Sequence, residues 1–114
     1  YAEQVIEGQL LAALSGSTAS DNVVLAYEPI WAIGTARAAS SNDAEAMMSH
    51  IRYVVNTKWG PAGSDIPLLY GGSVTDGNVR DYMDCQNIDG VLVGGASLDT
   101  DKFQALVQSV AGIT

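Results

Sequence analysis

The sequence has few of the residues that mark secreted, nucleic-acid-binding or membrane proteins. Cys85 is its one cysteine among 114 residues, so no intrachain disulfide can form and a reducing compartment fits best. Five basic residues stand against thirteen acidic ones, and the formal charge of −8 argues against nucleic acid as a partner. No apolar run approaches the ~18 residues that a membrane span needs.

The scarcity of basic residues also limits how the chain could bind an anion. An acidic surface repels phosphorylated metabolites at long range, so an anion site would need backbone N–H groups and helix ends rather than a basic patch. No basic and then apolar segment opens the chain, and we therefore expect a cytoplasmic protein. Because the chain starts at Tyr1 rather than at methionine, we also expect it to be processed, split or trimmed.

Apolar segments alternate between strand-like and helix-like spacing. With 47% hydrophobic and 16% charged residues, the chain is typical of one globular domain. Apolar runs predict strands at residues 23–27, 66–70 and 90–93, and the unbroken run at 23–27 is typical of a parallel strand covered on both faces. Periodic spacing predicts helices at 2–14, from an Asn42–Glu45 capping box to Trp59, near 78–84, and around 103–110. This order predicts an α/β fold of parallel βα units.

Three parallel strands make a small sheet. Such a sheet would have two open apolar edges, which proteins normally cover or pair. We therefore expect more sheet to be supplied by a second chain or by a second copy of this chain.

The unusual residues follow the strands. Glu28-Pro29, Gly71-Gly72-Ser73 and Gly94-Gly95 each come directly after a predicted strand or at its end, where parallel α/β folds bind ligands. Glycine pairs let backbone N–H groups approach an anion closely, so the two pairs could form one phosphate site. Alternatively, each pair is simply a tight βα turn.

Glu28 is the strongest candidate for a catalytic residue. A carboxylate partly withdrawn from water at the end of a buried strand can act as a general base near neutral pH. The alternative is a structural glutamate that pairs with Arg37, Arg52 or Arg80. Position alone does not separate the two.

The segment from Pro29 to Ala39 is longer than most βα loops. Pro29 stiffens its start, and Trp31 and Ile33 give it an apolar side, so it could be a lid that excludes water. The alternative is an ordered surface loop anchored by Trp31.

The remaining reactive or soft residues are interpreted as structural. His50 lies within a predicted helix and is expected to be solvated, and Cys85 is expected to be inert. We expect Asp89 to pair with Arg52. Three methionines, Met47, Met48 and Met83, are expected in the core rather than against a cofactor.

Three segments resemble one enzyme family. "AYEPIWAIGT" (26–35), "YGGSV" (70–74) and "DGVLVGGASL" (89–98), in this order and at these separations, closely resemble triosephosphate isomerases. The resemblance implies the C-terminal portion of a (β/α)8 TIM barrel, with residues 1–114 as part of a single domain: about three βα units and a preceding helix.

The family's roles can be carried to matching residues. The resemblance implies that Glu28 moves a proton between two carbons when dihydroxyacetone phosphate and glyceraldehyde 3-phosphate interconvert, in glycolysis and gluconeogenesis. It implies no cofactor and no metal. The implied phosphate-binding residues are Gly34, Ser73, Gly94 and Gly95, and the implied lid residues are Pro29, Ile30, Trp31, Ala32, Ile33 and Thr35.

The chain also departs from the family. The family's barrel has about 250 residues, and its lysine and electrophilic histidine come from earlier strands. The resemblance thus implies that the chain is an isomerase only when a complementary N-terminal barrel chain supplies the lysine and the histidine. It also implies that the completed barrels form dimers. The alternative is a non-catalytic phosphate-binding half-barrel that self-associates. Ala36-Arg37-Ala38-Ala39 replaces the family's glycine and Lys-Thr-Ala, which would restrict the lid's hinge.

Overall fold

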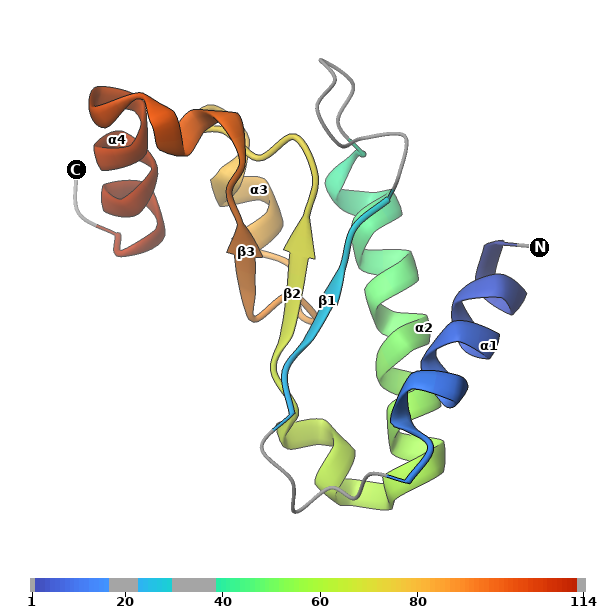
Figure 1. Cartoon of the computed structure of the whole chain (residues 1–114). Helices are drawn as coiled ribbons and strands as arrows, with labels where there is room; N and C mark the ends of the chain where they lie inside the picture. Colours follow the sequence, from blue (N-terminus) through green and yellow to red (C-terminus); the bar gives the residue numbers. More distant parts are fainter. Residues whose placement is uncertain (1, 17–22, 30–38, 113–114) are drawn as a thin grey trace.

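The computed structural model describes residues 2–16, 23–29 and 39–112, and these form three parallel strands with helices between them (Figure 1). The strands lie in the order β1-β2-β3, which confirms the predicted α/β class. None of the described helices is long and apolar enough to cross a bilayer. The elements in chain order are α1 (Ala2–Leu14), β1 (Leu25–Tyr27), α2 (Ser41–Trp59), the 3-10 helix η2 (Gly60–Asp65), β2 (Leu68–Gly71), α3 (Val79–Met83), β3 (Gly90–Leu92), the 3-10 helix η3 (Gly95–Leu98) and α4 (Thr100–Val110).

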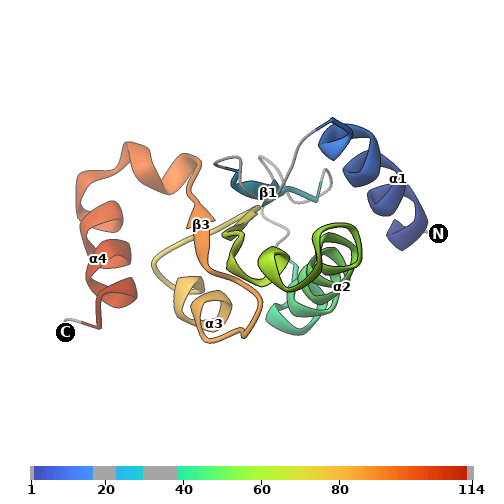
Figure 2. The same ribbon diagram turned by 90° about the horizontal axis from the view of Figure 1, so that it is seen from below.

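One face of the sheet is covered by helices. Leu25 pairs with Leu68 and Tyr27 with Tyr70, and the side chains of Leu68 and Tyr70 are fully buried. Figure 2 shows α2 and α3 on this side of the sheet, with α1 and α4 at its two flanks. Because side chains alternate along a strand, the next residue along each strand faces the other way.

The opposite face is left open by the described residues. Val24 is 58% exposed and Leu92 is 37% exposed, although both are apolar. The expectation that residues 23–27 are covered on both faces is therefore wrong for this chain, because α2 and α3 cover one face only. The Cα radius of gyration is 14.7 Å, against about 13 Å for a compact domain of this length, which fits an open half-structure.

Helix α2 begins differently from the predicted capping box. Ser40 is its N-cap, and the Ser40 hydroxyl accepts a hydrogen bond from the Asp43 N–H at 3.1 Å. Glu45 instead reaches across to Asn87, accepting from its backbone N–H and, at 2.6 Å, from its side-chain amide. The predicted Asn42–Glu45 box is wrong because Glu45 finds a partner 42 residues away rather than at the helix start.

The core lies between α2, α3 and the covered face of the sheet. Met48 is buried, and Met47 and Met83 pack against the same cluster, which confirms the methionines as core residues. The Tyr70 and Tyr82 rings pack with their centroids 4.6 Å apart. The Tyr82 hydroxyl donates a buried hydrogen bond to the Ala39 carbonyl, which ties α3 to the segment before α2.

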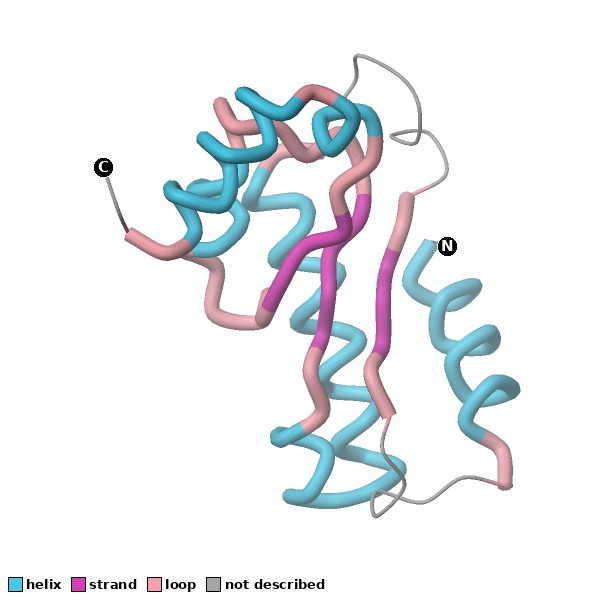
Figure 3. The backbone as a smooth tube through the Cα atoms, turned by 60° about the vertical axis from the view of Figure 1, so that its left-hand side comes forward, coloured by secondary structure: helices cyan, strands magenta, loops and turns pink. Residues whose placement is uncertain are grey.

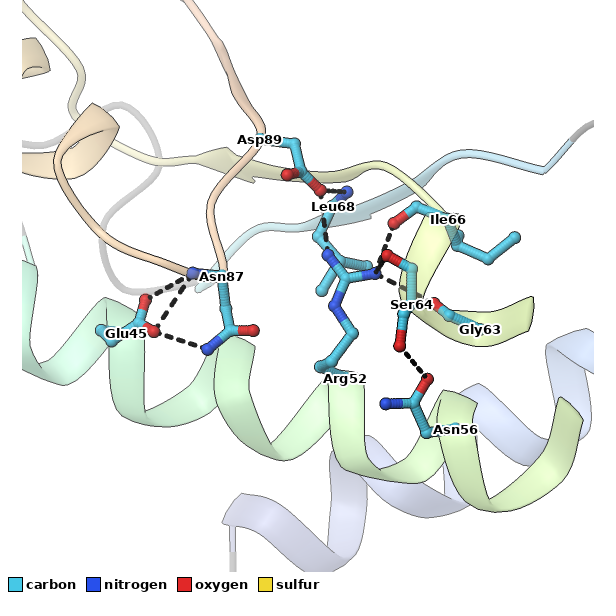
Figure 4. A network of polar contacts seen from close by, with 9 residues as sticks. All are labelled: Glu45, Arg52, Asn56, Gly63, Ser64, Ile66, Leu68, Asn87 and Asp89. Atoms are coloured by element: carbon cyan, nitrogen blue, oxygen red, sulfur yellow. Dashed lines mark hydrogen bonds and ion pairs between the residues drawn. The ribbon is translucent and has the colours of Figure 1, made fainter. Parts of the chain in front are cut away.

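Arg52 donates hydrogen bonds to four residues at the end of the sheet where the strands begin (Figure 4). Its guanidinium donates to the Asp89 carboxylate at 2.9 Å, and also to the carbonyls of Gly63, Ser64 and Ile66. The same Asp89 oxygen accepts from the Leu68 N–H at 2.8 Å. This confirms the predicted Arg52–Asp89 pair and shows that it joins α2, η2 and the starts of β2 and β3.

The structure contradicts the expectation for His50 and supports the expectation for Cys85. His50 is not solvated as expected: its side chain is 19% exposed and lies between α2 and the α1 carboxylates of Glu3 and Glu7, at 3.9 and 3.7 Å. The Cys85 thiol contacts the Asp81 and Ser41 carbonyls. Burial, with nearby carboxylates, raises the pKa of the Cys85 thiol, which disfavours the reactive thiolate and supports an inert cysteine.

Replacing Arg52 tests how much this network stabilises the fold. Arg52→Ala removes the guanidinium donor to Asp89 and to three carbonyls, and we expect it to lower the free energy of unfolding by about 2–3 kcal/mol. Arg80→Ala is the matched control, because Arg80 pairs with Asp84 at an exposed site and such pairs contribute about 0–1 kcal/mol. Urea unfolding measures both, and equal losses in the two variants would contradict this role.

The buried tyrosines predict a loss of stability in alkali. Burial raises the pKa of the Tyr27, Tyr70 and Tyr82 phenols above their ordinary value of 10.0. Folding therefore favours the protonated phenols, so their contribution to stability is complete below pH 10.0 and declines as the pH rises above it.

Tyr70→Phe should reduce that alkaline loss. It removes a buried hydroxyl that has no hydrogen-bond partner among the described residues, so stability near neutral pH should change little. Thermal unfolding of both proteins across the alkaline range is the measurement. The same pH dependence in wild type and variant would show that Tyr70 does not contribute to it.

Candidate active site

The residues after all three strands line one cavity. Parallel strands end at the same edge of the sheet, and the turns that follow β2 and β3 lie together there (Figure 3). The cavity has a volume of about 450 Å³. Its lining residues are Glu28, Gly71, Gly72, Ser73, Val74, Thr75, Leu92, Val93, Gly94, Gly95 and Ala96. The structure therefore brings together Glu28, Ser73, Gly94 and Gly95, four of the residues singled out from sequence.

Glu28 lies across the end of β2. It follows Tyr27, which pairs with Tyr70, and so it comes level with Gly71. A Cβ atom at Gly71 would lie 2.7 Å from Glu28 Cγ and 3.0 Å from its Oε1. Gly71 is therefore needed for the Glu28 side chain to lie over it. Sequence reasoning attributed this glycine to anion binding and missed its steric role, which depends on the strand register.

Two of the three arginines that could have paired with a structural Glu28 are bound elsewhere. Arg52 is bound to Asp89, and Arg80 lies beside Asp84 and donates to the Ser109 carbonyl. Arg37 lies outside the described residues. Glu28 is itself exposed, so the expected withdrawal from water is not provided by this chain, because the described residues leave its side of the sheet uncovered.

The turn after β2 is held by its own backbone and by one side chain. Val74 is buried, and its N–H donates to the Gly72 carbonyl at 3.0 Å. The Asn78 side chain bonds both Ser73 and Thr75. Sequence reasoning missed Asn78, and its position six residues after a glycine pair was the available signal.

The turn after β3 is open. A Cβ atom at Gly94 or Gly95 would meet no atom within 4 Å, so these glycines are not required by packing in the described structure. The Gly94 carbonyl accepts from the N–H and the hydroxyl of Ser97, which closes the turn into η3. Backbone without side chains thus faces the cavity, as an anion site without a basic patch requires.

The charge of the cavity wall is negative. Glu28 is the one ionisable residue among the described lining residues, and none of them is lysine or arginine. No group of three His, Cys, Asp or Glu residues within 2–16, 23–29 and 39–112 could hold a metal ion. An anion bound here would therefore depend on backbone N–H groups near β2 and β3 and on groups from elsewhere.

Part of the predicted site lies outside the described residues. Gly34 and the lid residues Ile30, Trp31, Ala32, Ile33 and Thr35 are in this category. Pro29 is described and is buried, in agreement with a fixed start for the segment.

Gly71→Ala tests the steric role of this glycine. The clash falls on an exposed side chain, so Glu28 should turn aside with less than about 1 kcal/mol change in unfolding free energy. The NMR shifts of the Glu28 side-chain carbons should change. Gly77→Ala is the control, because a Cβ there would lie 3.6 Å from Thr75 Oγ1, an ordinary contact. Unchanged Glu28 shifts in Gly71→Ala would contradict this role.

Comparison with known proteins places this geometry in one family. The family model described as "Triosephosphate isomerase" matches residues 1–110. Triosephosphate isomerases of two Streptococcus pyogenes serotypes, M18 and M49, are each 48% identical over 109 residues, covering 93% of this chain. This chain spans 43% of the length of those relatives.

A solved structure agrees with the fold. The triosephosphate isomerase of Bartonella henselae superposes with a TM-score of 0.81 at 34% identity, over 96% of this chain and 44% of that one. The chain therefore belongs to the triosephosphate isomerase family and has the fold of the C-terminal portion of its TIM barrel.

Proposed function

We propose that this chain is the C-terminal part of a triosephosphate isomerase that interconverts dihydroxyacetone phosphate and glyceraldehyde 3-phosphate. The observation that carries the proposal is the placement of Glu28 in the same cavity as Ser73, Gly94 and Gly95. In this proposal residues 1–114 form part of one barrel domain that works in the cytoplasm.

In the proposed mechanism Glu28 is the general base. Its carboxylate removes a proton from one carbon of the triose phosphate and returns it to the neighbouring carbon, so no net oxidant is needed. The phosphate group is held by backbone N–H groups of Gly34, Ser73, Gly94 and Gly95, and Pro29–Ala39 closes over the substrate. Support comes from the cavity lining and from the absence of a competing arginine at Glu28 among the described residues.

The described lining residues include no lysine, arginine or histidine that could polarise the substrate carbonyl. His50 faces α1, and Lys58 and Lys102 are exposed on α2 and α4, so none of them lines the cavity. A base without such a group is a poor catalyst, because the developing negative charge is not stabilised. We therefore propose that a complementary N-terminal part supplies lysine and histidine, covers the open face of the sheet, and allows completed barrels to dimerise.

A second candidate rests on the same open face. Val24, Leu92 and their neighbours would also be covered by another copy of this chain, giving a phosphate-binding module without turnover. Native mass distinguishes the two. The isomerase proposal expects a complex that releases a second chain of about 130–140 residues on denaturation, from the barrel's usual length. An inactive homo-oligomer would favour the module.

Glu28→Gln tests the base in the completed protein. We expect it to lower kcat by roughly 10²–10⁴-fold while the complex stays intact in native mass spectra, because the amide cannot accept the proton. Glu7→Gln is the control, since Glu7 lies on α1 beside His50, and not in the cavity wall. Full activity in Glu28→Gln would refute the proposed role of Glu28.

A further inference from the structure

Asn78 directs its side chain backwards, toward the turn after β2. It occupies the N-cap position of α3, where asparagine usually accepts a hydrogen bond from the first turn of the helix. Here it makes no such bond. Its side-chain amide instead donates to the Ser73 carbonyl at 2.8 Å, and its side-chain oxygen accepts from the Thr75 N–H at 2.8 Å.

These two bonds orient the peptide groups on both sides of Val74. The Ser73 carbonyl is held by Asn78, and the Thr75 N–H by the same side chain. The Gly72 carbonyl is held by the Val74 N–H at 3.0 Å. Because a trans peptide group is planar, with its C=O and N–H pointing in opposite directions, the bond to Gly72 also sets the direction of the Ser73 N–H.

The turn is also anchored at its middle and where it meets α3. The Val74 side chain is 3% exposed, so it fixes the middle of the turn in the core. The Thr75 carbonyl accepts from the N–H groups of Asn78 and Val79, which joins the turn to α3. The Asn78 side chain then supplies the link between this helix start and the cavity-lining residue Ser73.

We infer that Asn78 is a positioning residue for the phosphate-binding turn, acting through the Ser73 backbone without touching the ligand. The inference rests on the proposed function, because it needs Ser73 to bind phosphate. A backbone anion site binds well only when its N–H groups are held in place before the ligand arrives. Asn78 provides that order where the cavity wall has no basic side chain.

Phosphate titration of the ¹⁵N-labelled chain tests this role. Inorganic phosphate is added at constant ionic strength, and the amide shifts of Ser73, Gly94 and Gly95 give the dissociation constant. We expect Asn78→Ala to weaken phosphate binding by at least about tenfold, because the turn loses both side-chain bonds. Asn87→Ala is the matched control: it removes a 2.6 Å amide bond to Glu45 before β3 starts, and should change phosphate affinity by less than about twofold.

The possible results separate the positioning role of Asn78 from the proposed phosphate site. Wild-type affinity in Asn78→Ala overturns the positioning role and leaves the proposed function standing. Absence of phosphate binding in the wild-type chain overturns this inference together with the proposed phosphate site, while the Glu28 test still reports on the base. If Asn78→Ala does not fold, Asn78→Ser replaces it, because serine is also a favoured N-cap residue, adds no charge, and is too short to bond Ser73 and Thr75 as the amide does. Wild-type affinity in Asn78→Ser would then overturn the role.

Discussion

The Arg52 guanidinium is the interaction on which the arrangement of the strands depends. It binds the Asp89 carboxylate and three carbonyls of the segment before β2, and Asp89 in turn accepts from the Leu68 N–H. The starts of β2 and β3 are thereby held level. Because these strands have only three or four residues, a fixed start also fixes their ends. The Arg52–Asp89 pair at the start of the strands therefore also helps to set the spacing between Gly71 and the turn after Leu92, where the strands end.

The end of the sheet where the strands start and the end where they finish carry different kinds of residues. The base has a paired arginine and carboxylate, and these stabilise the fold without taking part in the cavity. The cavity edge has glycines, one carboxylate and no lysine or arginine among its described lining residues. In the proposed phosphate site the described residues offer oriented N–H groups rather than basic side chains, so the hydrogen bonds that hold the turns, such as those of Asn78, would matter more than surface charge.

The open face of the sheet supports the proposal that further strands complete this fold. Half of the sheet's side chains are covered by α2 and α3, while Val24 and Leu92 are exposed on the other half. In a complete barrel that face is filled by side chains from other strands. The solved relative has the same portion within a chain more than twice as long, since this chain covers 44% of it. In the proposed complete barrel, the added strands would also withdraw Glu28 from water.

The sequence by itself determined the element order, the parallel strands and the family, because apolar periodicity and three specific motifs are local signals. It also placed Glu28 and the glycine pairs at the strand ends. Only the tertiary structure decided which residues come into contact with one another. Glu45 binds Asn87 rather than capping α2, His50 lies against α1, and Gly71 makes room for Glu28. Each of these depends on contacts between segments far apart in sequence, and the register that creates them is set by packing and not by any short stretch of residues.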